Sequence, residues 1–183
     1  MPFPEFDPGK KKILFFSRGR GRGHAFPDME IVRELQKQSD DVQVRFVSYG
    51  TGARTIQQFG FPLIDLGLPE EGSLTQVSVL AAKLIGWLQP DLVISHEEFA
   101  VMPAAKIFDK KTVFVVDWFV EPDRLIMQML YYADEILFLD EPGTYEEPSF
   151  LKGKVICRIW SESISANWSL TRSPCVSRVP CTT

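Results

Sequence analysis

The stretch that decides the fold is ILFFSRGRGRGHAFPDMEIVREL, residues 13–35. It begins with a short apolar run and continues through a loop in which glycine and arginine alternate. It ends in a segment whose apolar residues Met29, Ile31, Val32 and Leu35 recur at helical spacing. This pattern predicts a strand, a glycine-rich turn and a helix with one buried stripe, in that order.

The same alternation of strands and helices continues along the body of the chain. The expected strands cover residues 12–17, 42–48, 61–66, 91–95, 112–116 and 135–139, and a seventh begins at 154–156. The expected helices cover residues 27–38, 51–59, 73–88, 99–108 and 122–133, with Ser73 as the N-cap of the third. Strands that are apolar throughout and separated by helices predict an α/β fold, a Rossmann-like doubly wound parallel sheet of about six or seven strands with helices on both faces.

Length and composition are those of one ordinary globular domain, with 183 residues of which 45% are hydrophobic and 24% charged. We expect an N-terminal extension over residues 1–11, a Rossmann-like domain over 12–156 and an irregular tail over 157–183. The tail holds all three cysteines, at positions 157, 175 and 181, and shows no period of 2 or 3.6. Either it is disordered, or the natural reading frame is lost near its start.

Charge and targeting signals exclude several classes of protein. The net charge is −4, so the chain lacks the broad basic face that non-specific nucleic-acid binding needs. It has neither a secretory signal nor a run of about 18 uncharged apolar residues, and a cytoplasmic location is expected. Since there is no CxxC pair and the two histidines are far apart in sequence, no metal site is expected.

The glycine-rich loop is the first candidate site, because ligands of doubly wound sheets bind at the carboxyl ends of the strands. Glycines allow positive backbone angles and close ligand approach, while helix amides and guanidinium groups suit phosphate oxygens. The expected phosphate- or acceptor-binding residues of this loop are Arg18, Gly19, Arg20, Gly21, Arg22 and Gly23. The alternative interpretation is a tight turn with solvated arginines.

His24 ends this loop and is either a general base or a residue that caps or packs the loop. A second group, SHEEF at residues 95–99, follows the fourth strand. Glu97, or Asp117 after the fifth strand, would orient His24. Acids at the start of a helix are also favoured by the helix dipole, so a structural role is the alternative. The remaining candidates for phosphate or acceptor binding in this group are Ser95, His96 and Glu98.

Together these segments resemble the N-terminal domain of GT-B glycosyltransferases, above all the MurG-like group and its relatives among UDP-sugar transferases. Residues 13–35 match a first strand, a glycine-rich loop that ends in Gly-His, and a proline that opens the first helix. PDLVISHEEFAVMPAAKIF, residues 90–108, resembles a later strand, its acceptor-side loop and a proline-containing helix. GKVI, residues 153–156, resembles the strand before the interdomain linker, so the resemblance spans about residues 10–156.

This resemblance implies the acceptor-binding half of an enzyme that transfers a hexosyl group from a nucleotide sugar to an acceptor hydroxyl. It implies His24 as the base, oriented by Asp117 or Glu97, and no cofactor apart from the nucleotide-sugar co-substrate. The expected partners are a sugar or lipid-linked acceptor, a donor domain in cis or in trans, and a peripheral membrane contact. The chain departs from the family in its alternating arginines and in lacking a second Rossmann-like domain, so we expect it to be truncated before the donor domain and inactive alone.

Three alternatives remain open at this point. The chain could be a non-catalytic binding subunit of a split transferase, or an epimerase-like fragment that binds a UDP-sugar. It could also be a dinucleotide-binding oxidoreductase domain. Against the last, the loop lacks GxGxxG, and Ser48 and Tyr49 stand where an acidic residue would bind the ribose.

Overall fold

A single parallel sheet organises the molecule, as described by a computed structural model for residues 6–117, 125–139 and 155–157. The strand order in this part of the chain is β3-β2-β1-β4-β5-β6-β7, and every neighbouring pair is parallel. The chain adds strands in one direction up to β3 and then returns to start β4 beside β1. The strands are β1 (Lys11–Ser17), β2 (Val42–Ser48), β3 (Leu63–Asp65), β4 (Leu92–His96), β5 (Lys111–Val116), β6 (Glu135–Phe138) and β7 (Val155–Cys157).

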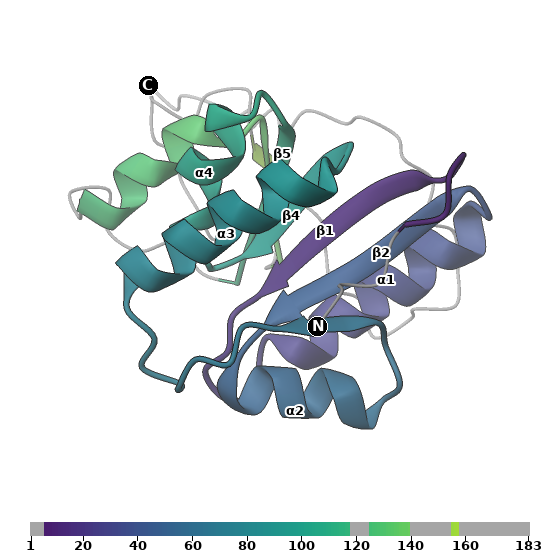
Figure 1. Ribbon diagram of the computed structural model, residues 1–183, viewed down its shortest axis with the longest axis horizontal. Coiled ribbons are helices and arrows are strands. Elements are labelled where there is room, and N and C mark those ends of the chain that lie inside the picture. Colours follow the sequence, from purple (N-terminus) through teal and green to yellow (C-terminus); the bar gives the residue numbers. More distant parts are fainter. Residues whose placement is uncertain (1–5, 118–124, 140–154, 158–183) are drawn as a thin grey trace, which may run out of the picture.

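Helices cover both faces of this sheet, which confirms the Rossmann-like doubly wound α/β fold (Figure 1). The helices are α1 (Ala25–Gln38), α2 (Gly50–Gln58), α3 (Leu74–Leu88), α4 (Val101–Ile107) and the 3-10 helix η1 (Leu125–Tyr132). The last was expected as an α-helix. In the described part it is wound more tightly, and the Ala133 N–H donates to Leu130 O, three residues back, at 3.0 Å.

Two boundaries differ from expectation in ways that matter for the site and the tail. β4 runs one residue further than predicted, so His96 is the last residue of the strand instead of part of the loop. β7 pairs with β6 and includes Cys157, which was expected to begin the tail. The remaining tail, residues 158–183, lies outside the described residues.

The two faces of the sheet have separate cores because the side chains of a strand alternate between them. Leu14 and Phe16 of β1 pack with α3, α4 and η1. Ile13 and Phe15 of the same strand pack with α1 and α2 on the opposite face. β1 is therefore buried on both faces, as expected for a central strand of a parallel sheet.

Helix α3 is apolar almost throughout, yet it buries only one side. Ser73 is its N-cap, as predicted, and the Ser73 hydroxyl accepts a hydrogen bond from the Gln76 N–H at 3.2 Å. The exposed side carries Leu74, Val79 and Trp87. The expected peripheral membrane contact stays a prediction. Among the described residues, no helix combines the length and apolarity that a membrane span needs.

Asp134 joins the starts of β5 and β6. Its Oδ2 accepts hydrogen bonds from the backbone N–H and the hydroxyl of Thr112, both at 2.9 Å, and its Oδ1 lies 2.6 Å from Lys106 Nζ. Partial burial opposes ionisation, but the bonds from Lys106 and Thr112 outweigh it and lower the pKa of Asp134. The ionised carboxylate therefore stabilises the fold.

Replacing Asp134 should test this contribution through its pH dependence. We expect Asp134→Ala to lower the free energy of unfolding by about 1–2 kcal/mol at pH 7, because the partly exposed carboxylate makes several charge-assisted bonds. Because the pKa of Asp134 is lower in the folded state, the variant should show its full loss of unfolding free energy above the unfolded-state pKa of about 3.9. The loss should disappear as pH falls through the folded-state pKa. Urea unfolding between pH 3 and 7 measures it, with Asp134→Asn as the matched control that keeps an acceptor oxygen. A pH-independent loss would contradict the explanation.

Candidate functional site

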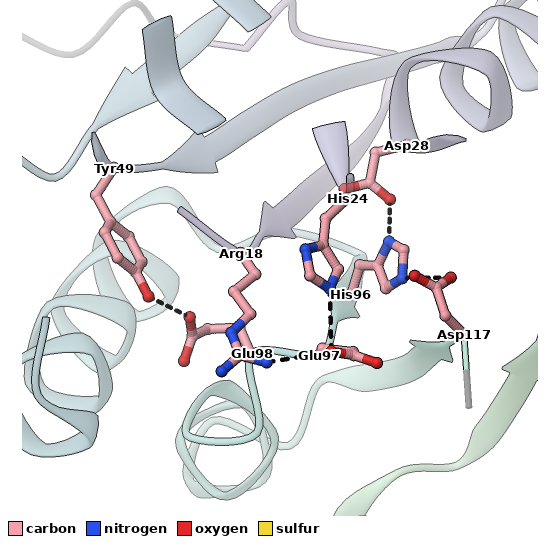
Figure 2. A network of polar contacts seen from close by, with 8 residues as sticks. All are labelled: Arg18, His24, Asp28, Tyr49, His96, Glu97, Glu98 and Asp117. Atoms are coloured by element: carbon pink, nitrogen blue, oxygen red, sulfur yellow. Dashed lines mark hydrogen bonds and ion pairs between the residues drawn. The ribbon is translucent and has the colours of Figure 1, made fainter. Parts of the chain in front are cut away.

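The candidate site lies where the chain leaves β1 and β4, the two neighbouring strands between which the strand order reverses. Ser17 of β1 pairs with His96 of β4, so the residues that follow each strand meet at one edge of the sheet. Such a point is where open α/β sheets bind ligands. Figure 2 shows the side chains that gather there, with His24 from the loop before α1 and Glu97 and Glu98 from the loop after β4.

Glu97 has a backbone conformation that few non-glycine residues adopt. Its φ is +53°, in the left-handed region, and its N–H donates to Val115 O at 3.1 Å. This turn sends the side chains of Glu97 and Glu98 in different directions, the first toward His24 and the second toward Tyr49 (Figure 2). Strain of this kind, about 1–3 kcal/mol, is kept where surrounding contacts demand it and is frequent at functional sites.

Glu97 holds both His24 and Arg18. Its Oε2 lies 3.0 Å from His24 Nε2 and 3.1 Å from Arg18 Nη1, and the side chain is only 3% exposed. Burial favours the neutral acid, but the hydrogen bond with His24 and the basic side chains around the carboxylate outweigh it and lower the pKa of Glu97. An ionised Glu97 is therefore positioned to orient His24, the role for which the sequence offered either Glu97 or Asp117.

Asp117, the other acid considered for that role, contacts His96 instead. The fully buried His96 ring lies between two carboxylates, with Nδ1 2.6 Å from Asp28 Oδ1 and Nε2 3.0 Å from Asp117 Oδ1. Burial opposes protonation of His96, but the charges of and hydrogen bonds to both acids outweigh it and raise its pKa to about 10. At neutral pH His96 is thus an imidazolium that donates from both nitrogens.

Glu98 is part of a separate buried group. The Tyr49 hydroxyl donates to Glu98 Oε2 at 2.8 Å, and the Ser95 hydroxyl donates to the Glu98 backbone carbonyl at 2.9 Å. Burial raises the pKa of Glu98 despite the bond from Tyr49. Ser95 and His96 were expected to bind phosphate or acceptor, but both are fully buried and their polar atoms are engaged within the protein. In this structure neither side chain is open to an acceptor.

The surroundings of the three loop glycines differ, and so does the reason for a glycine at each position. Gly19 lies against the Tyr49 ring, where a Cβ would come within 2.3 Å of a ring carbon. Gly21 has a φ of +72° and requires the freedom of glycine, whereas Gly23 has open space around it and no positive φ. Of the three glycines, only Gly21 therefore uses the positive φ that glycine allows. Close packing against Tyr49 explains Gly19 without a ligand.

A cavity of about 320 Å³ opens beside this network. Arg18 and Arg20 line it together with Tyr49 and a set of acids. Because Arg18 is already paired with Glu97, the exposed Arg20 and Arg22 are the loop arginines best placed to bind an anion. The four acids of the lining are Glu70, Glu71, Glu97 and Glu98.

Two residues of the network, Asp28 and Tyr49, were missed as site residues. Asp28 is fully buried on α1, one turn after His24, although acids of a first helical turn are usually exposed and need only the helix dipole as explanation. The sequence signal for this burial was the position of Asp28 close to Met29 and Ile31, which belong to the predicted buried stripe of the helix. Tyr49 follows β2 and gave no comparable signal, because its role depends on Gly19 and Glu98 from distant parts of the chain.

A pair of alanine substitutions separates the packing role of the loop glycines from ligand binding. Gly19→Ala should lower the free energy of unfolding by about 1–3 kcal/mol, because its Cβ would overlap the Tyr49 ring. Gly23→Ala, the matched control, should leave stability nearly unchanged because no atom lies within 4 Å of the added carbon. Urea unfolding measures both, and equal effects would contradict the packing explanation.

The buried imidazolium can be tested by a double-mutant cycle. His96→Ala should lower the free energy of unfolding by about 3–5 kcal/mol, because it leaves the Asp28 carboxylate buried without its partner. Asp28→Asn in the His96→Ala background should recover part of that loss, since the unpaired charge is gone. Chemical unfolding of the four proteins of the cycle provides the values. No recovery in the double variant would contradict a buried charge pair.

Comparisons with known proteins agree with this architecture. No protein-family model and no curated protein matches the sequence. Among solved structures, MurG of Acinetobacter baumannii is similar with a TM-score of 0.62 and 16% identity over 80% of this chain and 45% of its own. UDP-GlcNAc 2-epimerase of Neisseria meningitidis, bound to UDP-GlcNAc, has a TM-score of 0.54 and 15% identity over 68% of this chain and 39% of its own. CalG4, the calicheamicin glycosyltransferase, has a TM-score of 0.52 and 15% identity over 71% of this chain and 48% of its own.

The chain thus spans less than half the length of each of these proteins. At identities this low the likeness concerns the fold. The chain has the fold of a GT-B N-terminal domain.

Proposed function

We propose that this chain is the acceptor-side half of a glycosyltransferase, which moves a hexosyl group from a nucleotide sugar to an acceptor hydroxyl. The observation that carries the proposal is the 3.0 Å contact between His24 and Glu97 at the carboxyl ends of β1 and β4. The likeness in fold to MurG and to the calicheamicin glycosyltransferase supports it. A buried acid beside a histidine at a ligand-binding edge is the arrangement that general-base catalysis needs.

In the proposed mechanism, ionised Glu97 accepts a hydrogen bond from the Nε2–H of neutral His24, which keeps the ring proton on Nε2 and the lone pair on Nδ1. His24 Nδ1 is buried and has no hydrogen-bond partner among the described residues. An acceptor hydroxyl that reaches this nitrogen gives it a proton while the hydroxyl oxygen attacks the anomeric carbon. The bond between that carbon and the nucleoside diphosphate breaks, and the diphosphate leaves with the electron pair. Arg18 keeps Glu97 in place from the other side.

The donor side of the reaction belongs to a second domain, in cis or in trans. Coverage supports this assignment, because the chain spans 45% of MurG and 48% of the calicheamicin enzyme. Alone, the chain is proposed to bind acceptor without turnover. An acceptor phosphate, if the acceptor carries one, would lie against Arg20 and Arg22, which are exposed at the mouth of the loop.

The likeness to UDP-GlcNAc 2-epimerases supports a second candidate, the corresponding half of an epimerase. Such an enzyme would convert a UDP-sugar without any acceptor. The requirement for an acceptor therefore separates the two candidates.

A chimera tests the catalytic role of His24. Residues 1–157, which include all of β7, are joined to the donor domain of a structurally similar transferase, and transfer is measured with a panel of hydroxyl acceptors. His24→Ala should lower kcat by about 10²–10⁴-fold and leave the KM for the nucleotide sugar nearly unchanged, because the base acts only on the acceptor. Glu34→Gln is the matched control and should keep full activity, because this carboxylate pairs with Lys37 of the same helix and not with the site network.

Two outcomes would decide against the proposal. Turnover that survives His24→Ala would show that His24 is a structural residue of the loop. Conversion of the UDP-sugar in the absence of any acceptor would favour the epimerase candidate instead.

A further inference from the structure

The only two histidines of the chain meet at the candidate site. His24 and His96 are far apart in the sequence, yet their ring centroids lie 4.7 Å apart in an edge-to-face arrangement. Asp117 joins them from the end of β5. One ligand atom of each of the three residues lies within 4.8 Å of the others. The sequence argument against a metal site, that the histidines are separated, is removed by the fold.

The surroundings of His96 are those of a metal-binding histidine. Its Nδ1 bonds to Asp28 Oδ1 at 2.6 Å, and both side chains are fully buried. This leaves Nε2 directed toward Asp117, and the His24 ring lies edge to face with the His96 ring (Figure 2). Histidines that bind metals generally donate their second nitrogen to a carboxylate, which fixes the tautomer and the ring orientation.

Glu97 provides an independent observation. Its Oε2 contacts His24 Nε2, but its Oε1 has no hydrogen-bond partner among the described residues although the side chain is only 3% exposed. A buried carboxylate oxygen without a partner is costly, and a cation beside it would remove that cost. The Glu97 carboxylate adjoins the cluster through its contact with His24 (Figure 2).

We propose that His24 Nε2, His96 Nε2 and Asp117, with Glu97 completing the set, bind one divalent transition-metal ion of the zinc type. Two imidazoles and carboxylates are ligands that suit zinc, whereas magnesium and calcium prefer oxygen ligands throughout. Ligand atoms at about 2.1 Å from one ion lie roughly 3.4 Å apart in a tetrahedron, so ligand atoms now up to 4.8 Å apart need to approach one another by up to about 1.4 Å. The ion takes the place of the hydrogen now shared by His96 and Asp117, and that proton leaves to solvent.

The inference goes beyond the proposed function, because a bound ion and a free base exclude each other. An ion on His24 Nε2 displaces the hydrogen bond to Glu97 and forces the remaining ring proton onto Nδ1. The lone pair that would accept the acceptor's proton is then absent. The metal-bound form is an inhibited form of the site, and the reaction itself uses the metal-free form.

Metal binding is measured on the full chain after removal of metals with a chelator. The three cysteines could bind zinc by themselves, so all measurements use the Cys157→Ser, Cys175→Ser, Cys181→Ser background. Calorimetric titration with zinc chloride should give one ion per chain with a Kd in the micromolar range or below. Both histidine imidazoles should shift in NMR spectra, and magnesium chloride at millimolar concentration should shift neither.

Variants locate the ion. His24→Ala and Asp117→Ala should each weaken zinc binding by at least tenfold, and Glu34→Gln should leave it unchanged. Asp117→Asn serves as a second, milder change, and circular dichroism verifies that each variant is folded. Absence of zinc binding at 100 µM (roughly two orders above the expected Kd) would overturn the proposal. Binding that persists in the folded His24→Ala and Asp117→Ala variants would overturn it as well.

These results are independent of the proposed transferase function. The titration contains no sugar and no donor domain, whereas the base assignment rests on turnover of the chimera. If one of the two proposals fails its experiment, the other can still be tested by its own.

Discussion

The candidate site depends on one buried interaction, the imidazolium of His96 between Asp28 and Asp117. The ring lies in the interior, where a charge is tolerated only when it is paired, so both acids have to stay in place. Asp28 belongs to α1 and Asp117 follows β5, and His96 ends β4 between them. The interaction thus fixes the first turn of α1 against the sheet. His24 immediately precedes that turn, and its position relative to Glu97 follows from it.

Most of the fold could be predicted from the sequence because its signals are local. Apolar runs such as that of β1, the glycine-rich loop and the Ser73 cap are each read within a few residues, and the parallel sheet follows from their alternation. Parts of the site could also be predicted, since the strand ends pointed to His24, Glu97 and Asp117. The pairing between these residues could not be predicted. It depends on the left-handed turn at Glu97, which no residue pattern announces, and on the burial of Asp28.

Two adjacent glutamates illustrate how a backbone turn divides one sequence motif into two chemical environments. Glu97 meets two basic side chains and its pKa is lowered, whereas Glu98 is enclosed beside Tyr49 and its pKa is raised. In the sequence they are equivalent neighbours. A single positive φ separates them, and so a candidate orienting carboxylate and a buried structural acid stand next to each other.

The central place of β1 also constrains how the chain folds. β1 lies between β2, which follows it closely, and β4, whose pairing is anchored by a hydrogen bond from Lys12 N to Asp91 Oδ2, 79 residues away. During synthesis one edge of this apolar strand stays open until β4 has left the ribosome, and closing that long loop carries an entropic cost. We therefore expect the joining of the two halves of the sheet across β1 and β4 to be the slow step of folding. His24 and Glu97 come together only when β4 pairs with β1. In a nascent or partly folded chain the site residues that precede β4 are already present, but the site is not yet assembled.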